Sequence, residues 1–64
     1  MMELSEREVE VLKCLAEGMD NNQIAETLMV SVHTVKAHLC SIFTKLKANG
    51  RVQAAVRAIK LGII

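Results

Sequence analysis

SVHTVKAHLCSIFTKL, residues 31–46, has a pattern that predicts one long helix with two different faces. At about 100° per residue, apolar side chains spaced by three and four residues line one side of a helix. Ser31 precedes this helix as an N-cap, since its side-chain oxygen can accept a first-turn N–H. We therefore expect a helix over 32–47 whose buried side carries Val32, Val35, Leu39, Ile42, Phe43 and Leu46.

The opposite side of this helix collects small or basic residues and no acidic ones. It contains His33, Ala37, Ser41 and Thr44, with Lys36 and Lys45 on the flanks and Cys40 beside Lys36. A slim helix with a cationic outer face fits the major groove of B-DNA, which is about 12 Å wide and admits one α-helix. The alternative is a solvated polar face, which would be the better interpretation for an isolated amphipathic helix. The rest of the chain has to decide between them.

A first helix is expected over residues 6–17. Ser5 stands at its N-cap and Glu8 follows three residues later, which is the spacing of a capping box. Gly18 follows as a natural C′ residue. Its buried side is predicted to carry Val9, Leu12, Leu15 and Ala16.

A second, short helix is expected over residues 22–28, with Asp20 or Asn21 as its cap. Only Met29 and Val30 then separate it from Ser31. So short a turn predicts two helices that cross steeply, as in a helix-turn-helix, whereas a simple antiparallel helix pair would want a longer connection.

A fourth helix is expected over residues 51–61, after the turn signal Asn49-Gly50. It carries two apolar stripes. Val52, Ala55, Val56 and Ile59 are predicted to close the core, while the second stripe lets another copy of the chain approach closely: Ala54, Ala58 and Leu61. The alternative, that the alanines only serve helix propensity, carries equal weight.

Charge is divided unevenly along the chain. Residues 1–26 hold seven acidic and two basic side chains, a net −5, while residues 27–64 hold no acidic and six basic ones, a net +6. Such asymmetry favours a polyanion-binding side, because basic side chains neutralise phosphates and release counterions. In the first half, solvation of one face explains the charges equally well.

Several classes of protein are disfavoured. The sequence has no secretory segment and no apolar run long enough to span a bilayer, which predicts a cytoplasmic protein with reduced thiols. His33, His38 and Cys40 lack the spacing of metal ligands, so we expect neither a metal nor another cofactor. No nucleophile and base are visibly paired, and a 64-residue chain leaves little room for a pocket, so an enzyme is not expected.

Several short motifs occur in a fixed order: LSERE (4–8), EG (17–18), NNQIA (21–25), VS (30–31), TVK and H (34–38), KL (45–46) and R followed by QAA (51–55). With them the chain resembles, from end to end, the LuxR-type, GerE-like helix-turn-helix domain of NarL/FixJ-class response regulators and quorum-sensing regulators. The resemblance implies one all-α domain over 1–64, a four-helix bundle. It also implies that helix 32–47 enters the major groove and that helix 51–61 pairs two copies on DNA.

The resemblance also implies roles for single residues. Lys36, Ala37 and Cys40 match base-reading positions, although longer side chains are frequent at the last two, and a thymine methyl is the partner that alanine suits. His38 is expected to pack, and Arg51 either contacts the DNA backbone or holds the first turn of its helix. Phosphate or positioning roles fall to Asn22, Ser31 and Thr34 by resemblance, to His33, Ser41 and Thr44 by their place on the outer face, and to Lys45 and Lys47 beyond the base-reading turns.

The predicted function is sequence-specific binding of double-stranded promoter DNA as the effector domain of a bacterial transcription regulator, with a two-component response regulator the expected type. The expected assembly is a homodimer that is weak without DNA. In the family a sensor or receiver domain usually precedes this module, so a domain of a longer regulator and a small stand-alone regulator both stay open. The rival is a helical protein–protein module, against which the small outer face argues, because interface centres favour large anchors.

Overall fold

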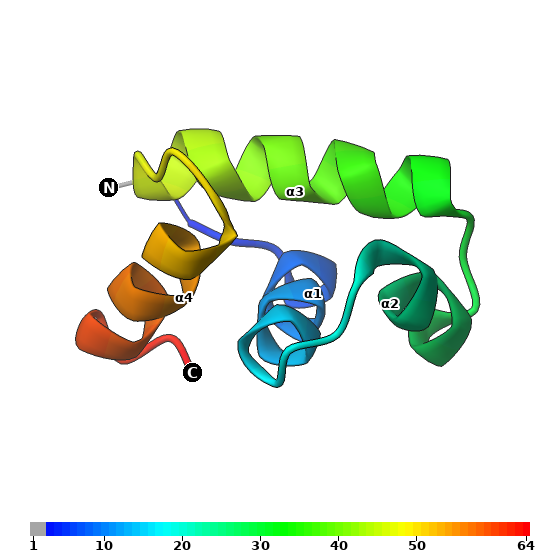
Figure 1. Cartoon of the computed structure of the whole chain (residues 1–64). Helices are drawn as coiled ribbons and strands as arrows, with labels where there is room; N and C mark the ends of the chain where they lie inside the picture. The colour runs from blue at the N-terminus through cyan, green and yellow to red at the C-terminus, as the bar shows by residue number, and fades with distance from the viewer. Residues whose placement is uncertain (1–2) are drawn as a thin grey trace.

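The computed structural model describes residues 3–64 and forms four helices with no strand among those residues. They are α1 (Glu6–Ala16), α2 (Asn21–Leu28), α3 (Val32–Leu46) and α4 (Arg51–Lys60). Each bound lies within one residue of the one expected from the sequence. Figure 1 shows α3 lying across α1, α2 and α4, which it contacts on one side only. The predicted all-α helix-turn-helix architecture is confirmed, and it leaves the other side of α3 uncovered.

Local capping explains why the helices begin where they do. Before α1 the backbone N–H of Glu8 donates to Ser5 Oγ (3.1 Å), and that of Ser5 donates to Glu8 Oε1 (2.8 Å), so the predicted capping box is formed. Asp20, rather than Asn21, caps α2 through a second such box with Gln23. Each of these caps stabilises its helix by about 1 kcal/mol, which fixes the boundaries locally.

The turn between α2 and α3 is as tight as its sequence predicts. Met29 adopts the left-handed conformation (φ 58°), and the N–H of Val30 donates back to Ala25 O (3.0 Å). Ser31 then caps α3 by accepting the N–H of Thr34 (3.0 Å). With no further residue in the connection, α3 leaves α2 at the steep angle visible in Figure 1.

The core draws on all four helices. In α3 the predicted stripe is confirmed: Val35, Leu39, Ile42 and Leu46 are buried, with Val32 and Phe43 packed against them. The whole buried apolar cluster consists of Val11, Leu12, Cys14, Leu15, Ile24, Ala25, Val35, Leu39, Ile42, Leu46, Ala54 and Ala58.

The prediction for α1 is partly wrong. Leu12 and Leu15 are buried as expected, and Cys14 is a small core residue as its type predicts, but Val11 joins them, whereas Val9 is only half-buried and Ala16 is exposed. The buried side comprises positions 8, 11, 12, 14 and 15, so it begins with a glutamate. Because its first member is charged, the stripe is not visible as an apolar pattern.

The prediction for α4 is wrong for most of its residues, because the buried and exposed sides are exchanged; Ala55 packs against the core and Leu61 is exposed, as predicted. Ala54 and Ala58 are completely buried, whereas Val52, Val56 and Ile59 are 78%, 43% and 60% exposed. The reason is that α4 packs closely against both α1 and α3. Only small side chains such as the methyl group of alanine fit between the helices at this distance. Ala54 and Ala58 therefore belong to the core and cannot line a free dimer surface.

Two arginines fix α4 to its neighbours. The Arg51 guanidinium donates to Asn21 Oδ1 (2.9 Å) and to the carbonyl of Met19, so it joins the start of α4 to the turn before α2. Arg57 donates to Leu46 O (3.3 Å) at the end of α3. Arg51 therefore holds the start of its helix in place, and its contact with the DNA backbone stays a prediction.

Past α4 the chain turns back on itself. The N–H of Ile63 donates to Ala58 O (2.8 Å), and Ile63 and Ile64 pack against the core instead of remaining free. Leu61 is exposed and lines a hollow with Leu4, Val9, Leu46 and Ile63. The last residues therefore contribute to the core of a very small domain.

Candidate nucleic-acid interface

The uncovered side of α3 carries a continuous row of exposed side chains. Its members recur at steps of three and four residues, with Lys36 and Ala37 adjacent in the same turn: His33, Lys36, Ala37, Cys40, Thr44 and, at the C-cap, Lys47. We call this row the α3 face. It contains no acidic residue, and its only long side chains are the two lysines.

The middle of the α3 face is slim. Ala37 and Cys40 are both exposed, and the Thr44 hydroxyl bends back to donate to the Cys40 carbonyl (3.0 Å). Nothing bulky therefore stands between the helix axis and an approaching surface. Lys36, one turn earlier, is the long hydrogen-bond donor of this middle section.

Polar side chains surround the beginning of α3. The Ser31 hydroxyl donates to Thr34 Oγ1 (3.0 Å) while it accepts the Thr34 N–H, so these two side chains are fixed against each other. Asn22 on α2 is exposed, and His38 is half-buried on the flank of α3. The N-terminal end of a helix carries a partial positive charge that favours phosphate.

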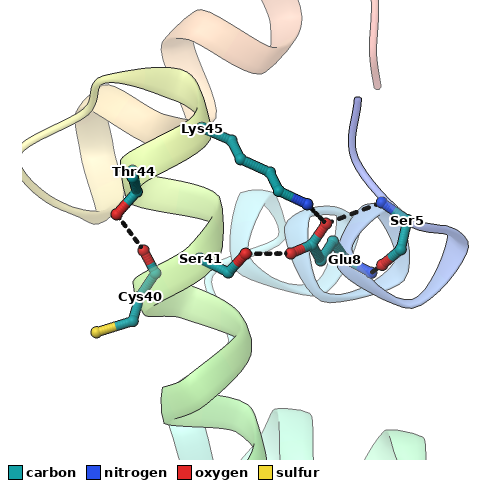
Figure 2. Close-up of polar contacts among 6 residues, drawn as sticks. All are labelled: Ser5, Glu8, Cys40, Ser41, Thr44 and Lys45. Carbon is teal, nitrogen blue, oxygen red and sulfur yellow. Dashed lines mark hydrogen bonds and ion pairs between the residues drawn. The ribbon is translucent and has the colours of Figure 1, made fainter. Parts of the chain in front are cut away.

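Ser41 and Lys45 do not lie on the α3 face. In Figure 2 their side chains point toward α1, while those of Cys40 and Thr44 point to the other side of α3. Ser41 Oγ donates to Glu8 Oε2 (2.6 Å), and Lys45 Nζ lies 2.8 Å from Glu8 Oε1. The expectation that Ser41 belongs to the outer face is wrong, and the Lys45 ammonium is paired with Glu8, while its predicted contact with a DNA phosphate stays a prediction. Both residues flank the face, and the carboxylate draws their side chains inward.

Glu8 is the residue that sequence reasoning missed, because it was assigned only to the capping box. It is 4% exposed, and it accepts bonds from Ser41, Lys45 and the N–H of Ser5. Burial by itself would raise the pKa of this carboxyl, but the bonds from Lys45, Ser41 and Ser5 outweigh burial and lower the pKa to about 2. Glu8 is therefore charged at neutral pH and ties α3 to the start of α1.

The exposed stripe of α4 forms a second candidate surface. Val52, Val56 and Ile59 lie four and three residues apart, so they share one side of the helix, and we call them the α4 patch. Of the predicted pairing residues, Ala54 and Ala58 lie on the buried side of α4, and only Leu61 is exposed. The spacing of Val52, Val56 and Ile59 predicts one apolar side of the helix, but it does not tell that this side is exposed.

Among residues 3–64, no cluster of three or more His, Cys, Asp or Glu side chains is placed to hold a metal ion. No helix in that range combines the length and the apolar character needed to cross a bilayer. The two cysteines are free, Cys14 in the core and Cys40 on the α3 face.

The sequence of this helix-turn-helix domain matches a family model. Residues 2–58 match the GerE model, described as bacterial regulatory proteins of the luxR family. The chain belongs to the luxR family. It is accordingly a DNA-binding module of transcription regulators and not an enzyme, as the sequence predicted.

Three similar proteins show the extent of the similarity. The transcriptional regulatory protein LnrK of Bacillus subtilis is 41% identical over 98% of this chain and 29% of its own length. The response regulator ChrA of a heme-sensing two-component system has a TM-score of 0.96 and 39% identity, covering all of this chain and 32% of that one. The VqmA dimer of Vibrio cholerae has a TM-score of 0.92 and 28% identity, over 98% and 28% of the two chains. The chain thus spans less than a third of the length of these proteins.

Proposed function

We propose that this domain binds a specific promoter sequence with the α3 face in the major groove. The observation that carries the proposal is the face itself, an uncovered helix side with no acidic residue and a slim middle at Ala37 and Cys40. The groove is about 12 Å wide and accepts one helix, so small central side chains permit close approach to base edges.

Within this proposal the residues divide into two groups. Lys36 is the donor suited to a guanine, while Ala37 and Cys40 are small enough to lie against thymine methyl groups. The DNA backbone is contacted by residues that surround the groove-facing turns of α3: Asn22, Ser31, His33, Thr34, Thr44 and Lys47. Ser41 and Lys45 are left out of this set because their side chains engage Glu8.

The test is selection of binding sites from a random pool of duplex DNA by the purified domain, followed by affinity measurements at two salt concentrations. We expect one enriched motif containing a guanine beside thymines, and an affinity that falls with salt, by about 0.9 in log–log slope for each phosphate contact. A pool without enrichment, or an affinity independent of salt, would contradict the proposal.

We further propose that two copies pair on DNA through the α4 patch. Val52, Val56 and Ile59 are exposed apolar side chains on one side of a helix. The similarity to VqmA, which is described as a dimer, supports a paired arrangement. Three side chains bury far less than the roughly 800 Å² per partner of a stable interface, so the free dimer is weak. The DNA site then contains two half-sites about ten base pairs apart, centre to centre.

In the cell we propose a role as the effector domain of a cytoplasmic regulator of the response-regulator type. The support is the similarity to ChrA and LnrK over almost the whole of this chain. In such a regulator a receiver or sensor domain controls when the DNA-binding module acts. Transcription by bacterial RNA polymerase from a promoter carrying the selected site, with and without the domain, tests whether binding alters initiation.

A further inference from the structure

One basic side chain in residues 27–64 already forms an ion pair with an acidic side chain. After residue 26 the basic side chains are Lys36, Lys45, Lys47, Arg51, Arg57 and Lys60. Within the described residues, Lys45 is the one of these six that forms an ion pair, with Glu8 of α1. Lys36 and Lys47 stand exposed on the α3 face, so the recognition helix carries cations in two different situations.

The Glu8 carboxylate is held rigidly in place. Its Oε1 accepts the N–H of Ser5 (2.8 Å) and the ammonium of Lys45 (2.8 Å), and its Oε2 accepts the hydroxyl of Ser41 (2.6 Å). Ser5 is the N-cap of α1, so the acid is fixed by the helix that carries it. The Lys45 side chain, 27% exposed, leans over it (Figure 2).

A DNA phosphate would compete with this carboxylate for the same ammonium group. The competition is unequal, because Glu8 is buried and would keep its charge with one partner fewer, whereas a phosphate on DNA is surrounded by water and counterions. The pKa of the carboxyl, lowered to about 2, agrees with an acid that remains ionised and paired at neutral pH.

We propose that Glu8 withholds Lys45 from the DNA backbone and so limits the sequence-independent part of DNA affinity. The inference rests on the proposed function, since it assumes that α3 lies against DNA. Every phosphate contact strengthens binding to all sequences alike, and a genome offers a great excess of non-specific sites. An acid that removes one cation from this contact lowers background binding and leaves Lys36, Ala37 and Cys40 to read bases.

A purely structural role for the ion pair makes a different prediction. If Glu8 only fastened α3 to α1, its loss would weaken the fold and the DNA complex without changing the number of phosphates contacted. If Glu8 withholds Lys45, its neutralisation adds a contact. The salt dependence of binding separates these two roles, because its slope counts phosphate contacts and does not report stability.

The experiment measures binding of a fluorescent duplex of random sequence, about 20 base pairs long, at salt concentrations from about 50 to about 300 mM. Four proteins are compared: wild type, Glu8→Gln, Lys45→Met and the double variant Glu8→Gln/Lys45→Met. Glutamine carries no charge; its oxygen can accept the Ser5 N–H, and its NH2 group can donate to Ser41 Oγ in place of the bond that Ser41 donates to Glu8. Far-UV circular dichroism confirms that each protein is folded.

For Glu8→Gln we expect a slope steeper than that of the wild type by about 0.9 and an affinity about fivefold to tenfold higher at 0.1 M salt. The double variant should return to the wild-type slope, because the released lysine is then absent. The double variant leaves no buried charge unpaired, so it serves as the deciding comparison if either single variant is unfolded.

A double variant whose slope is flatter than that of the wild type by about 0.9 would show that Lys45 contacts a phosphate in the native complex, which overturns the inference. A folded Glu8→Gln protein with an unchanged slope would overturn it as well. Failure of the wild type to bind any duplex at low salt would instead contradict the proposed function, so the two failures are distinguishable.

Discussion

Helices α3 and α4 are both amphipathic, yet the sequence predicts the orientation of one correctly and inverts the other. In α3 the large apolar side chains face inward and the small or basic ones face out. In α4 the order is reversed: Ala54 and Ala58 are buried, and the larger Val52 and Ile59 are exposed. The difference teaches that the size of an apolar side chain does not by itself decide which way it faces.

The physical reason lies in how each helix is packed. One side of α3 rests across three helices, so a broad apolar stripe is needed to fill the space beneath it. α4 is wedged against α1 and α3, where the backbones come close and methyl groups suffice. Its larger apolar side chains are then left for water or for a second copy.

The largest expected effect comes from the same substitution in an alanine of each helix. Ala58→Glu should destabilise the fold by more than about 4 kcal/mol, enough to unfold a domain of this size, because an unpaired carboxylate would be buried. Ala37→Glu should change stability by less than about 0.5 kcal/mol but abolish DNA binding. Urea unfolding followed by circular dichroism measures the stability of both variants. A fully stable Ala58→Glu protein would mean that α4 is rotated from the orientation described.

Acid sharpens the comparison, because α3 is tied to α1 by a titratable pair. The pKa of Glu8 is lowered from 4.5 to about 2, so its contribution is present above pH 4.5 and is lost as the pH falls through 2. By linkage this contribution is about 3 kcal/mol. Unfolding free energies measured between pH 7 and pH 2 should fall accordingly, and Glu8→Gln should remove that part of the pH dependence. If the unfolding free energy of Glu8→Gln fell by the same amount, the pH dependence would belong to other acidic residues.

Lys36→Ala tests base reading by the α3 face. We expect a loss of about 1–3 kcal/mol in binding free energy on the selected site, with relaxed preference at one guanine. Lys47→Ala is the matched control, since Lys47 lies beyond the base-reading turns and should weaken all sequences alike. Equal losses on every sequence for Lys36→Ala would reassign Lys36 to the phosphate backbone.

Val56→Glu tests pairing through the α4 patch, and it should have the smallest effect. On a duplex with two half-sites we expect loss of cooperativity, about tenfold in affinity, while binding to a single half-site stays nearly unchanged. Lys13→Ala on α1 alters net charge by the same amount and serves as the control. Cooperative binding that survived in Val56→Glu would exclude the α4 patch as the pairing surface.

The features that the sequence predicts well are those encoded locally. Ser5, Asp20 and Ser31 start their helices through bonds to residues three positions away, so the helix starts follow from short stretches of chain. The stripe of α3 was equally clear, because no large apolar residue competes for its outer side.

The features that it misses depend on distant partners. Glu8 meets Ser41 and Lys45 across more than thirty residues, and nothing beside Glu8 in the chain indicates that its carboxylate is buried. The burial of Ala54 depends in the same way on how closely three helices meet. The candidate base-reading residues were found because their exposure follows from the stripe on the other side of α3.

The hollow beneath Leu61 also bears on how the chain is connected. Leu4 and Ile63, near the two ends of the described chain, both line it together with Leu46. A few added residues would join them, and the chain could then be opened in the exposed turn between α3 and α4. In such a circular permutant, α1, α2 and α3 would keep their order, and the loose ends would flank the recognition helix at its C-terminal end. The same three-dimensional domain would then form from a chain in which α4 precedes α1 in the sequence.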